Sequence, residues 1–454
     1  MASNLTSMRL ADCMDAIIDY RGKTPTKTTS GIPLITAKII KNGRIQDVNE
    51  YIAEGDYDAW MRRGLPKEGD VVLTTEAPLG EVAQLDSRKI ALAQRVITLR
   101  GKKGVLDNDY LLYLLQSHDV QHQLDGRGTG STVKGIKQSE LKEIILSFPS
   151  INVQKRIAQH LKNIDQKITL NHQINQTLEQ MAQTLFKSWF VDFDPVIDNA
   201  LDAGFFEQDW PIPDELQHRA EARKTVRESE GFKPLPEDVR QLFPDAFEES
   251  ELGWVPKGWA ISTISDMARI NSKTWSKKSA PEVVEYVDLS NAKNGVILGT
   301  DVYVFDEAPS RARRILNKKD TIFGLVRPAN RSYAFVDKDG LTGSTGFAVV
   351  TAKKSNGANF IYQLLTSDNI IDLFIRIADG AAYPAIKPDD IADVQFAMPS
   401  DQVLDYFELV ANSYKERSAI GLTNNINLTA LRDTLLPKLI SGEQRLDDIE
   451  LAVE

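Results

Sequence analysis

The sequence predicts an α+β protein built from two copies of one unit, each a mixed domain followed by a long helix. Residues 110–190 align with residues 360–440 at a constant offset of 250. In each copy, short β-like runs come first and heptad-spaced apolar residues come last. A period this long is not that of a solenoid. We therefore expect two long helices that form an antiparallel coiled coil, related by a pseudo-two-fold axis.

Residues 1–150 are expected to form the first domain. Its β-like runs are bounded by Gly, Asp, Asn and Pro, as strand ends often are. One helix is expected at about 109–124, where leucines recur. The predicted strands are Ile32–Thr36, Val71–Thr74, Val82–Leu85 and Val96–Leu99.

The period changes at residue 151. Over residues 151–191 apolar side chains recur at alternating spacings of four and three, with Asn171 and Asn175 in the middle of the seam. A helix of this length spans roughly 60 Å at about 1.5 Å per residue. We expect it to pack against the equivalent helix of the second copy, with Asn171, Asn175 and Asn425 fixing the register.

Residues 192–256 are rich in Asp, Glu, Pro and Gly. Residues 191–250 hold six basic and 16 acidic residues, a balance of −10 that equals the net charge of the whole chain. This composition favours a solvated acidic linker, with a short helix around 214–230. Because the excess charge is local, it does not exclude DNA as a ligand of the other segments.

Residues 257–400 repeat the first plan, and residues 401–454 form the distal helix and tail. A helix is expected at 359–377, and the distal seam is poorer because Gly421 lies at its centre. The predicted strands are Val283–Leu289, Thr321–Val326, Tyr333–Val336 and Phe347–Val350.

Composition and motifs exclude several classes of protein. The single cysteine, Cys13, rules out an intrachain disulfide framework. No apolar run reaches the length of a membrane span, so we expect a cytoplasmic protein without membrane contact. The Gly130–Lys137 loop lacks the order of a phosphate loop, and His118 and His122 have no third ligand in view. We therefore expect no catalysis, no metal and no cofactor in this chain.

Glycine-rich loops in the first domain suit DNA. Backbone amides and short hydroxyls on such loops can bind phosphate, and Arg or Lys can reach guanine edges. Ordinary solvated turns remain the alternative for each loop. The predicted contacts are Arg21, Lys23, Thr24, Lys27, Lys38, Arg127, Thr129, Ser131, Thr132 and Lys134.

The second domain offers a different set of basic loops. Asn330 and Arg331 are attractive because Asn reads adenine and Arg reads guanine. The two copies match in their tails and differ in these loops, as expected of one scaffold that presents two readers. The predicted contacts here are Lys273, Lys277, Arg311, Arg313, Arg327, Asn330 and Arg331.

On these motifs the chain resembles the specificity subunit of Type I restriction-modification systems. The resemblance rests on Gly130–Lys137 with Leu141 and Pro149–Ile157, on Lys41–Ile45, and on Gly69–Leu73. The order of domain, helix, domain and helix extends it over the full length. The second copy departs from the pattern. Leu404 replaces Gln154, and Gly-Ala-Ala-Tyr at 380–383 replaces Gly-Ser-Thr-Val at 130–133.

The resemblance implies two target-recognition domains, at 1–150 and 257–400, and two spacer helices, at 151–191 and within 401–454. Such a subunit would be a non-catalytic reader of a bipartite DNA site. It would join two modification subunits, which methylate adenine N6 with S-adenosylmethionine, and two restriction subunits, which use ATP and Mg²⁺. The helix pair would set the gap between the half-sites.

Two other functions remain open at this point. One is a self-contained DNA adenine methyltransferase, which would bind S-adenosylmethionine alone. The other is a coiled-coil scaffold without DNA specificity. The sequence gives neither the recognised bases nor the length of the gap.

Overall fold

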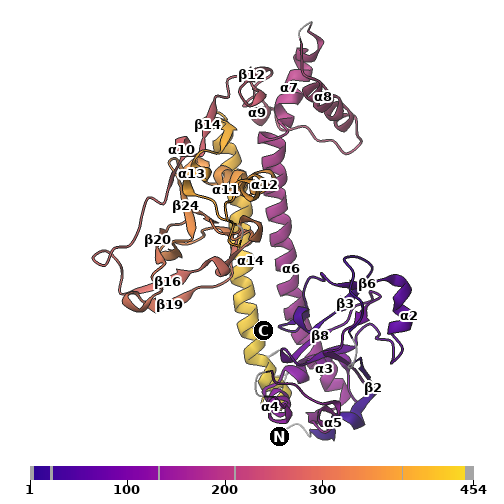
Figure 1. Ribbon diagram of the computed structural model, residues 1–454. Helices are drawn as coiled ribbons and strands as arrows, with labels where there is room; N and C mark the ends of the chain where they lie inside the picture. Colours follow the sequence, from indigo (N-terminus) through magenta and orange to yellow (C-terminus); the bar gives the residue numbers. More distant parts are fainter. Residues whose placement is uncertain (1–4, 21–23, 131–132, 209–210, 381, 445–454) are drawn as a thin grey trace. The chain divides into compact units, whose positions relative to one another are not determined.

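The computed structural model describes residues 5–20, 24–130, 133–208, 211–380 and 382–444. These residues form two compact units (Figure 1). Unit 1 comprises the residues up to His172 together with those from Leu422 onwards, and unit 2 comprises Gln173–Gly421. Each long helix therefore begins in one unit and ends in the other.

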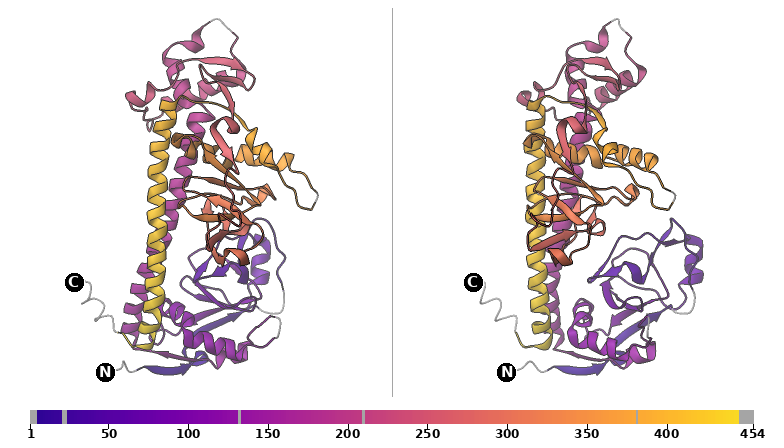
Figure 2. Two further views of the ribbon diagram at one scale, coloured as in Figure 1. Left: turned by 90° about the vertical axis from the view of Figure 1, so that its left-hand side faces the viewer. Right: turned by 60° about the vertical axis from the view of Figure 1, so that its left-hand side comes forward.

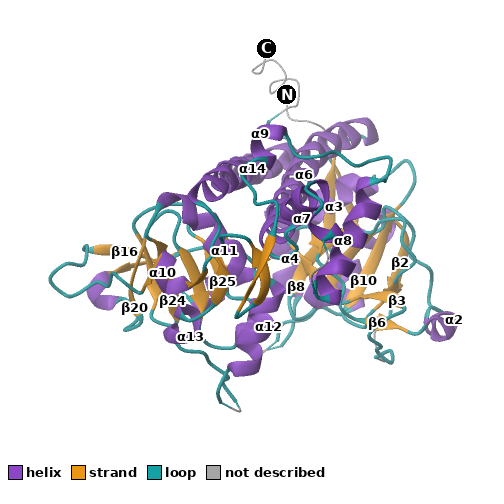
Figure 3. Ribbon diagram, turned by 90° about the horizontal axis from the view of Figure 1, so that it is seen from above, coloured by secondary structure: helices purple, strands orange, loops and turns teal. Residues whose placement is uncertain are grey.

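Unit 1 is built on a four-stranded antiparallel sheet of order β2-β10-β7-β8 (Figure 3). Its strands are β1 (Thr6–Arg9), β2 (Met14–Asp19), β3 (Ile32–Ile35), β4 (Ile40–Lys41), β5 (Arg44–Ile45), β6 (Tyr51–Ile52), β7 (Val71–Thr75), β8 (Leu79–Gln84), β9 (Ala91–Leu92), β10 (Val96–Gly101) and β11 (Ile145–Phe148). Its short helices are α1 (Leu10–Cys13), α2 (Tyr57–Trp60), α3 (Asn108–Gln116), α4 (His118–Arg127) and α5 (Gln138–Lys142), with 3₁₀ turns η1 (Ala37–Ile39) and η2 (Glu54–Asp56).

One face of this sheet packs on α3, whose Tyr110 and Leu111 are fully buried. The helix begins at a capping residue, Asp107, whose carboxylate accepts hydrogen bonds from the amides of Asp109 and Tyr110. Cys13, the last residue of α1, is buried as well. Burial raises the pKa of its thiol to about 11, so the thiol is protonated at neutral pH.

Unit 2 repeats this sheet as β15-β24-β21-β22. Its second sheet, β19-β16-β23-β20, has four strands, whereas the second sheet of unit 1, β6-β3-β9, has three. Its strands are β12 (Phe247–Ser250), β13 (Gly253–Pro256), β14 (Ile261–Thr263), β15 (Ala268–Ile270), β16 (Val283–Val287), β17 (Ala292–Lys293), β18 (Val296–Ile297), β19 (Asp301–Val304), β20 (Ala312–Leu316), β21 (Thr321–Gly324), β22 (Tyr333–Phe335), β23 (Leu341–Ser344), β24 (Phe347–Ala352) and β25 (Gln395–Ala397). Its short helices are α7 (Asp194–Asp202), α8 (Asp214–Arg227), α9 (Glu237–Arg240), α10 (Ile264–Met267), α11 (Ala358–Thr366), α12 (Asp368–Ile377) and α13 (Pro388–Ala392), with 3₁₀ turns η3 (Phe205–Glu207), η4 (Leu289–Asn291), η5 (Phe305–Glu307), η6 (Pro328–Asn330) and η7 (Ser355–Gly357).

The helix predicted at 109–124 is two helices, as is the one predicted at 359–377. Ser117 separates α3 from α4 and Ser367 separates α11 from α12, both with extended backbone, at ψ 148° and 147°. Each serine hydroxyl donates to a carbonyl three residues earlier, over 2.7 and 2.8 Å. These local hydrogen bonds compete with continuation of the helix, which the leucine spacing alone does not reveal.

The two long helices, α6 (Ile151–Phe190) and α14 (Asp401–Ser441), run side by side and antiparallel (Figures 1 and 2). In unit 1, Asp165 of α6 pairs with Arg432 of α14 over 2.9 Å. In unit 2, Glu179 of α6 pairs with Lys415 of α14 over 2.7 Å. Residues further along α6 therefore pair with residues earlier in α14, as in an antiparallel pair. On both helices, the residues predicted to form the seam are buried or half-buried. The predicted antiparallel coiled coil is confirmed.

The prediction of a solvated linker at 192–256 is wrong. Helices α7, α8 and α9 and the β12–β13 hairpin pack into the core of unit 2, where Val196, Phe205 and Phe243 are buried. Part of the acidic charge is matched internally: Arg223 of α8 forms two hydrogen bonds, of 2.7 and 2.9 Å, with the Asp198 carboxylate. The apolar residues are too irregularly spaced to show a period, so composition suggested a tether. The expected short helix is present as α8.

Among the described residues, no helix combines the length and apolar character needed to cross a membrane. That same part of the chain contains no group of three or more His, Cys, Asp and Glu side chains placed to hold a metal ion.

Candidate nucleic-acid interface

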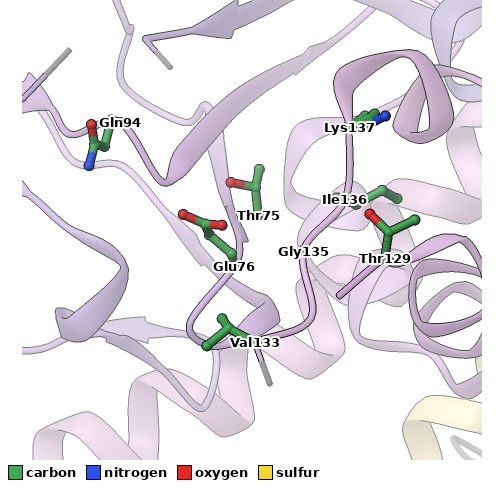
Figure 4. Close-up of a pocket in the computed structure, with 8 residues that line it drawn as sticks. All are labelled: Thr75, Glu76, Gln94, Thr129, Val133, Gly135, Ile136 and Lys137. Atoms are coloured by element: carbon green, nitrogen blue, oxygen red, sulfur yellow. The ribbon is translucent and has the colours of Figure 1, made fainter. Parts of the chain in front are cut away.

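An open cleft of about 390 Å³ lies in unit 1, between the β7–β8 turn and the loop that follows α4 (Figure 4). In Figure 4 the Glu76 and Thr75 side chains lie between Gln94 on one side and the 133–137 loop on the other. The cleft is lined by Thr75, Glu76, Gln94, Thr129, Val133, Gly135, Ile136 and Lys137.

Backbone hydrogen bonds hold the two walls of this cleft together. Thr129 and Gly135 exchange a pair of hydrogen bonds of 2.8 and 2.9 Å, which closes the loop on itself. The Ile136 amide then donates to the Thr75 carbonyl over 3.0 Å. A Cβ at Gly135 would lie 3.1 Å from the Glu76 Cβ, so glycine permits this close approach.

The cleft contains polar groups of several kinds. The Glu76 carboxylate pairs with Arg95 over 2.8 Å, and about 42% of the Glu76 side chain stays exposed. Gln94 Oε1 accepts a hydrogen bond from the Thr24 hydroxyl over 3.1 Å. The Thr75 side chain is 1% exposed, and its hydroxyl has no hydrogen-bond partner within the described part of the chain. Buried polar groups normally have one.

Unit 2 contains the same backbone frame, residue for residue, at offset 250. Asp379 and Ala385 exchange hydrogen bonds of 3.0 and 2.8 Å, as Thr129 and Gly135 do in unit 1. The Ile386 amide donates to the Leu325 carbonyl over 2.9 Å, which repeats the bond between Ile136 and Thr75. We call each arrangement of strand turn and returning loop a reader frame.

The side chains on the two reader frames differ. Val326 stands at the position of Glu76, and Arg327 at that of Ala77; Ala77 and Arg327 share the left-handed backbone, with φ 50° and 52°. The Arg327 guanidinium lies 4.7 Å from the centre of the Tyr383 ring and donates to the Ala382 carbonyl over 3.0 Å. One scaffold thus carries an acid and an amide in unit 1, and a stacked arginine in unit 2.

In unit 1 the structure brings some of the predicted DNA contacts to the reader frame. Thr129 lines the cleft and Thr24 touches Gln94. Lys134 lies within the loop that Thr129 and Gly135 close, and it pairs with Asp125 over 2.6 Å. Arg127 also pairs with an acid, Glu140, over 3.3 Å. Exposed pairs of this kind contribute little stability, so these cations can exchange partners easily.

Other predicted contacts of unit 1 are not gathered at the cleft. Lys27 pairs with Glu50 over 2.8 Å, and Lys38 is exposed on η1. The predictions at Arg21, Lys23, Ser131 and Thr132 lie outside the described residues.

The predicted contacts of unit 2 fall into two groups. In the first group, Arg327 and Arg331 flank η6 and Asn330 is its last residue; Arg331 pairs with Asp368 over 2.6 Å. The second group lies where residues 273–277 meet β20, because the Trp275 amide donates to the Arg313 carbonyl over 2.8 Å. It contains Lys273, Lys277, Arg311 and Arg313, the last of which stacks 4.6 Å from the Phe305 ring centre.

The three asparagines predicted to fix the register, Asn171, Asn175 and Asn425, all lie on the contact between the two long helices. In unit 1, Asn171 donates to Asn425 over 2.8 Å, and Asn425 donates to the Ile168 carbonyl over 3.3 Å. In unit 2, Asn175 donates to the Ser418 carbonyl over 3.2 Å and faces Gly421. Asn175 and Asn425 are thus equivalent residues. Asn425 faces Asn171, and Asn175 faces Gly421, which is the counterpart of Asn171 at offset 250.

Sequence reasoning missed Glu76, Gln94 and the buried hydroxyl of Thr75. All three stand in or beside apolar strand-like runs and belong to no basic loop, so a search for cations passes over them. A signal was available in the repeat, because Pro78 and Pro328 also match at offset 250 and flank the positions where the side chains change.

Comparison with known proteins identifies relatives of one kind. The family model described as "Type I restriction modification DNA specificity domain" matches residues 6–180. The Type I restriction enzyme MjaIX specificity subunit of Methanocaldococcus jannaschii is 24% identical over 432 residues, which cover 92% of this chain and 88% of the relative. The HindI specificity subunit of Haemophilus influenzae is 24% identical over 407 residues, which cover 83% and 87%.

A solved structure shares the fold over nearly the full length. The S subunit of a Type I restriction-modification system from M. genitalium matches with a TM-score of 0.53 and 14% sequence identity, covering 96% of both chains.

Proposed function

The chain belongs to the family of Type I restriction-modification specificity subunits, which recognise DNA sequence and are non-catalytic by themselves, and we propose that it reads a bipartite site, one half with each unit. The observation that carries this proposal is the pair of reader frames. The same backbone hydrogen bonds recur at offset 250, while Glu76 in one frame is replaced by Val326, and Ala77 by Arg327, in the other. A conserved frame with different side chains is what two different half-sites require.

The predicted contacts of each unit supply the remaining interactions in this proposal. Cations that exchange their surface ion pairs for phosphates, such as Arg127 and Lys134, would position the duplex. Arg327 and Arg331 in unit 2 would reach base edges. DNA recognition in this family serves a complex, since specificity subunits act with modification and restriction subunits.

For the complex we propose two modification subunits and two restriction subunits around one copy of this chain. The S-adenosylmethionine, ATP and Mg²⁺ of the reaction would be held by those partners. Methylation of adenine N6 requires the base to leave the stack. This chain would therefore bind the duplex so that the target adenine meets the partner's pocket. The antiparallel α6–α14 pair would set the number of unspecified base pairs between the half-sites.

Long-read methylation sequencing tests this function. A host strain without restriction-modification genes receives the modification subunit with or without this chain. We expect N6-methyladenine in one bipartite motif only when the chain is present. Methylation at the same motif without the chain, or at no motif with it, would show that sequence recognition lies elsewhere.

A further inference from the structure

We propose that Glu76 and Gln94 read one base of the half-site bound by unit 1, and that they select a base with an exocyclic amino group in the major groove, adenine or cytosine. This inference rests on the proposed function and adds the chemistry of one position to it. It assigns a role to an acid and an amide that the basic loops do not explain.

The charge of Glu76 is the first argument. Of the described residues that line the cleft, it is the only acid. A carboxylate on a surface that binds DNA is repelled by phosphates, so phosphate binding cannot account for it. The favourable partners for a carboxylate on DNA are amino groups of bases, and acidic side chains accept from cytosine N4 in the major groove. Adenine N6 presents the same donor.

The neighbours of Glu76 hold its side chain and backbone in place. Arg95 forms an ion pair with one of its carboxylate oxygens over 2.8 Å, and the side chain remains 42% exposed. Its backbone pairs with that of Gly135 in antiparallel orientation. The carboxylate is therefore fixed on the edge of an open cleft, where a base edge can reach it without a large rearrangement.

Gln94 adds an amide donor and acceptor to the same cleft. The Thr24 hydroxyl donates to Gln94 Oε1 over 3.1 Å, which orients the Gln94 amide group and directs its Nε2 away from that contact. The Thr75 hydroxyl is buried, so a base edge in the cleft does not contact it.

Unit 2 supports the assignment by contrast. Its frame replaces Glu76 with Val326 and presents Arg327, whose plane is set by the Tyr383 ring and the Ala382 carbonyl. A guanidinium donates where a carboxylate accepts, so the two frames suit complementary base edges. The corresponding position in the second half-site is expected to be guanine.

The test is the methylated motif of the complete system carrying Glu76→Ala or Glu76→Gln. We expect Glu76→Ala to relax one adenine or cytosine of the first half-site, with a loss of discrimination of roughly 10- to 100-fold, the value of one good base contact. The other half-site and the gap should not change. Glu76→Gln is isosteric and should favour adenine over cytosine at that position, because a carboxamide pairs with adenine N6 and N7.

Asp86→Ala is the matched control, since Asp86 is also an exposed acid of unit 1 paired with an arginine, Arg88, over 2.8 Å. It should leave every position unchanged. If Glu76→Ala prevents assembly, Glu76→Gln complexes assayed on base-substituted duplexes decide the matter. A motif unchanged by both variants, or relaxation at a guanine or thymine, would overturn this inference alone. A wild-type complex without any bipartite motif would overturn the proposed function as well.

Discussion

Gln154, at the start of α6, shows how one buried polar side chain can hold an element in place. It is 0% exposed, and all of its polar atoms are used. Its Oε1 accepts from the Asp107 amide over 3.0 Å, and its Nε2 donates to the carbonyls of Val105 and Pro149 over 3.0 and 2.9 Å. The equivalent residue of unit 2, Leu404, is also buried, at 2% exposure, and packs in an apolar core.

We expect Gln154→Leu to lower the free energy of unfolding of unit 1 by about 2–4 kcal/mol, because it leaves up to three backbone groups without partners. Urea unfolding followed by circular dichroism measures this. Leu404→Gln is the reciprocal variant and should also destabilise the protein, because the amide enters an apolar site. If Gln154→Leu leaves the unfolding midpoint unchanged, these hydrogen bonds do not hold the start of α6.

At the scale of elements, the helix pair contains two equivalent asparagines, Asn425 and Asn175, and their side chains form hydrogen bonds to different degrees. In unit 1 the Asn425 side chain is fully hydrogen-bonded, because Asn171 supplies a donor to its Oδ1. In unit 2 the equivalent Asn175 faces Gly421, and its Oδ1 has no partner among the described residues. A Cβ at Gly421 would lie 2.7 Å from that oxygen, which belongs to a side chain that can rotate.

Gly421→Asn should therefore raise the stability of unit 2 by about 1–2 kcal/mol. It supplies the missing donor and replaces a poor helix former. Asn171→Gly should lower the stability of unit 1 by a similar amount. Both changes can be measured as shifts of the urea midpoint, and helical circular dichroism verifies that α14 persists. Destabilisation by Gly421→Asn would mean that close packing at Gly421 matters more than the hydrogen bond.

Periodic elements could be predicted from the sequence, and contacts between distant residues could not. The seam of α6 and α14 is a local pattern, so its residues were predicted correctly, and the antiparallel direction followed from the internal repeat. The facing of Asn425 with Asn171 depends on the stagger of two helices, which spacing does not specify. Glu76 and Gln94 line the same cleft because β7 and β10 pair in a particular register, with Thr74 opposite Val96. The predicted DNA contacts themselves remain predictions.

At the scale of the whole molecule, the location of the acidic residues explains why a chain with a net charge of −10 can serve as a DNA reader. The excess acid is confined to the folded segment 192–256, where arginines of α8 and α9 match part of it. The two reader frames carry the cations and polar groups that face the proposed ligand. Since each long helix contributes to both units, the length of the helix pair is the property that we propose sets the gap.

The most direct test of this account removes one heptad from each helix, residues 171–177 of α6 and residues 419–425 of α14. A seven-residue deletion preserves the phase of the seam and shortens each helix by about 10 Å, which corresponds to about three base pairs of DNA. Long-read methylation sequencing of the complete system should show both half-sites unchanged and the gap shortened by about three base pairs. An unchanged gap would contradict the claim that two readers are spaced by one helix pair.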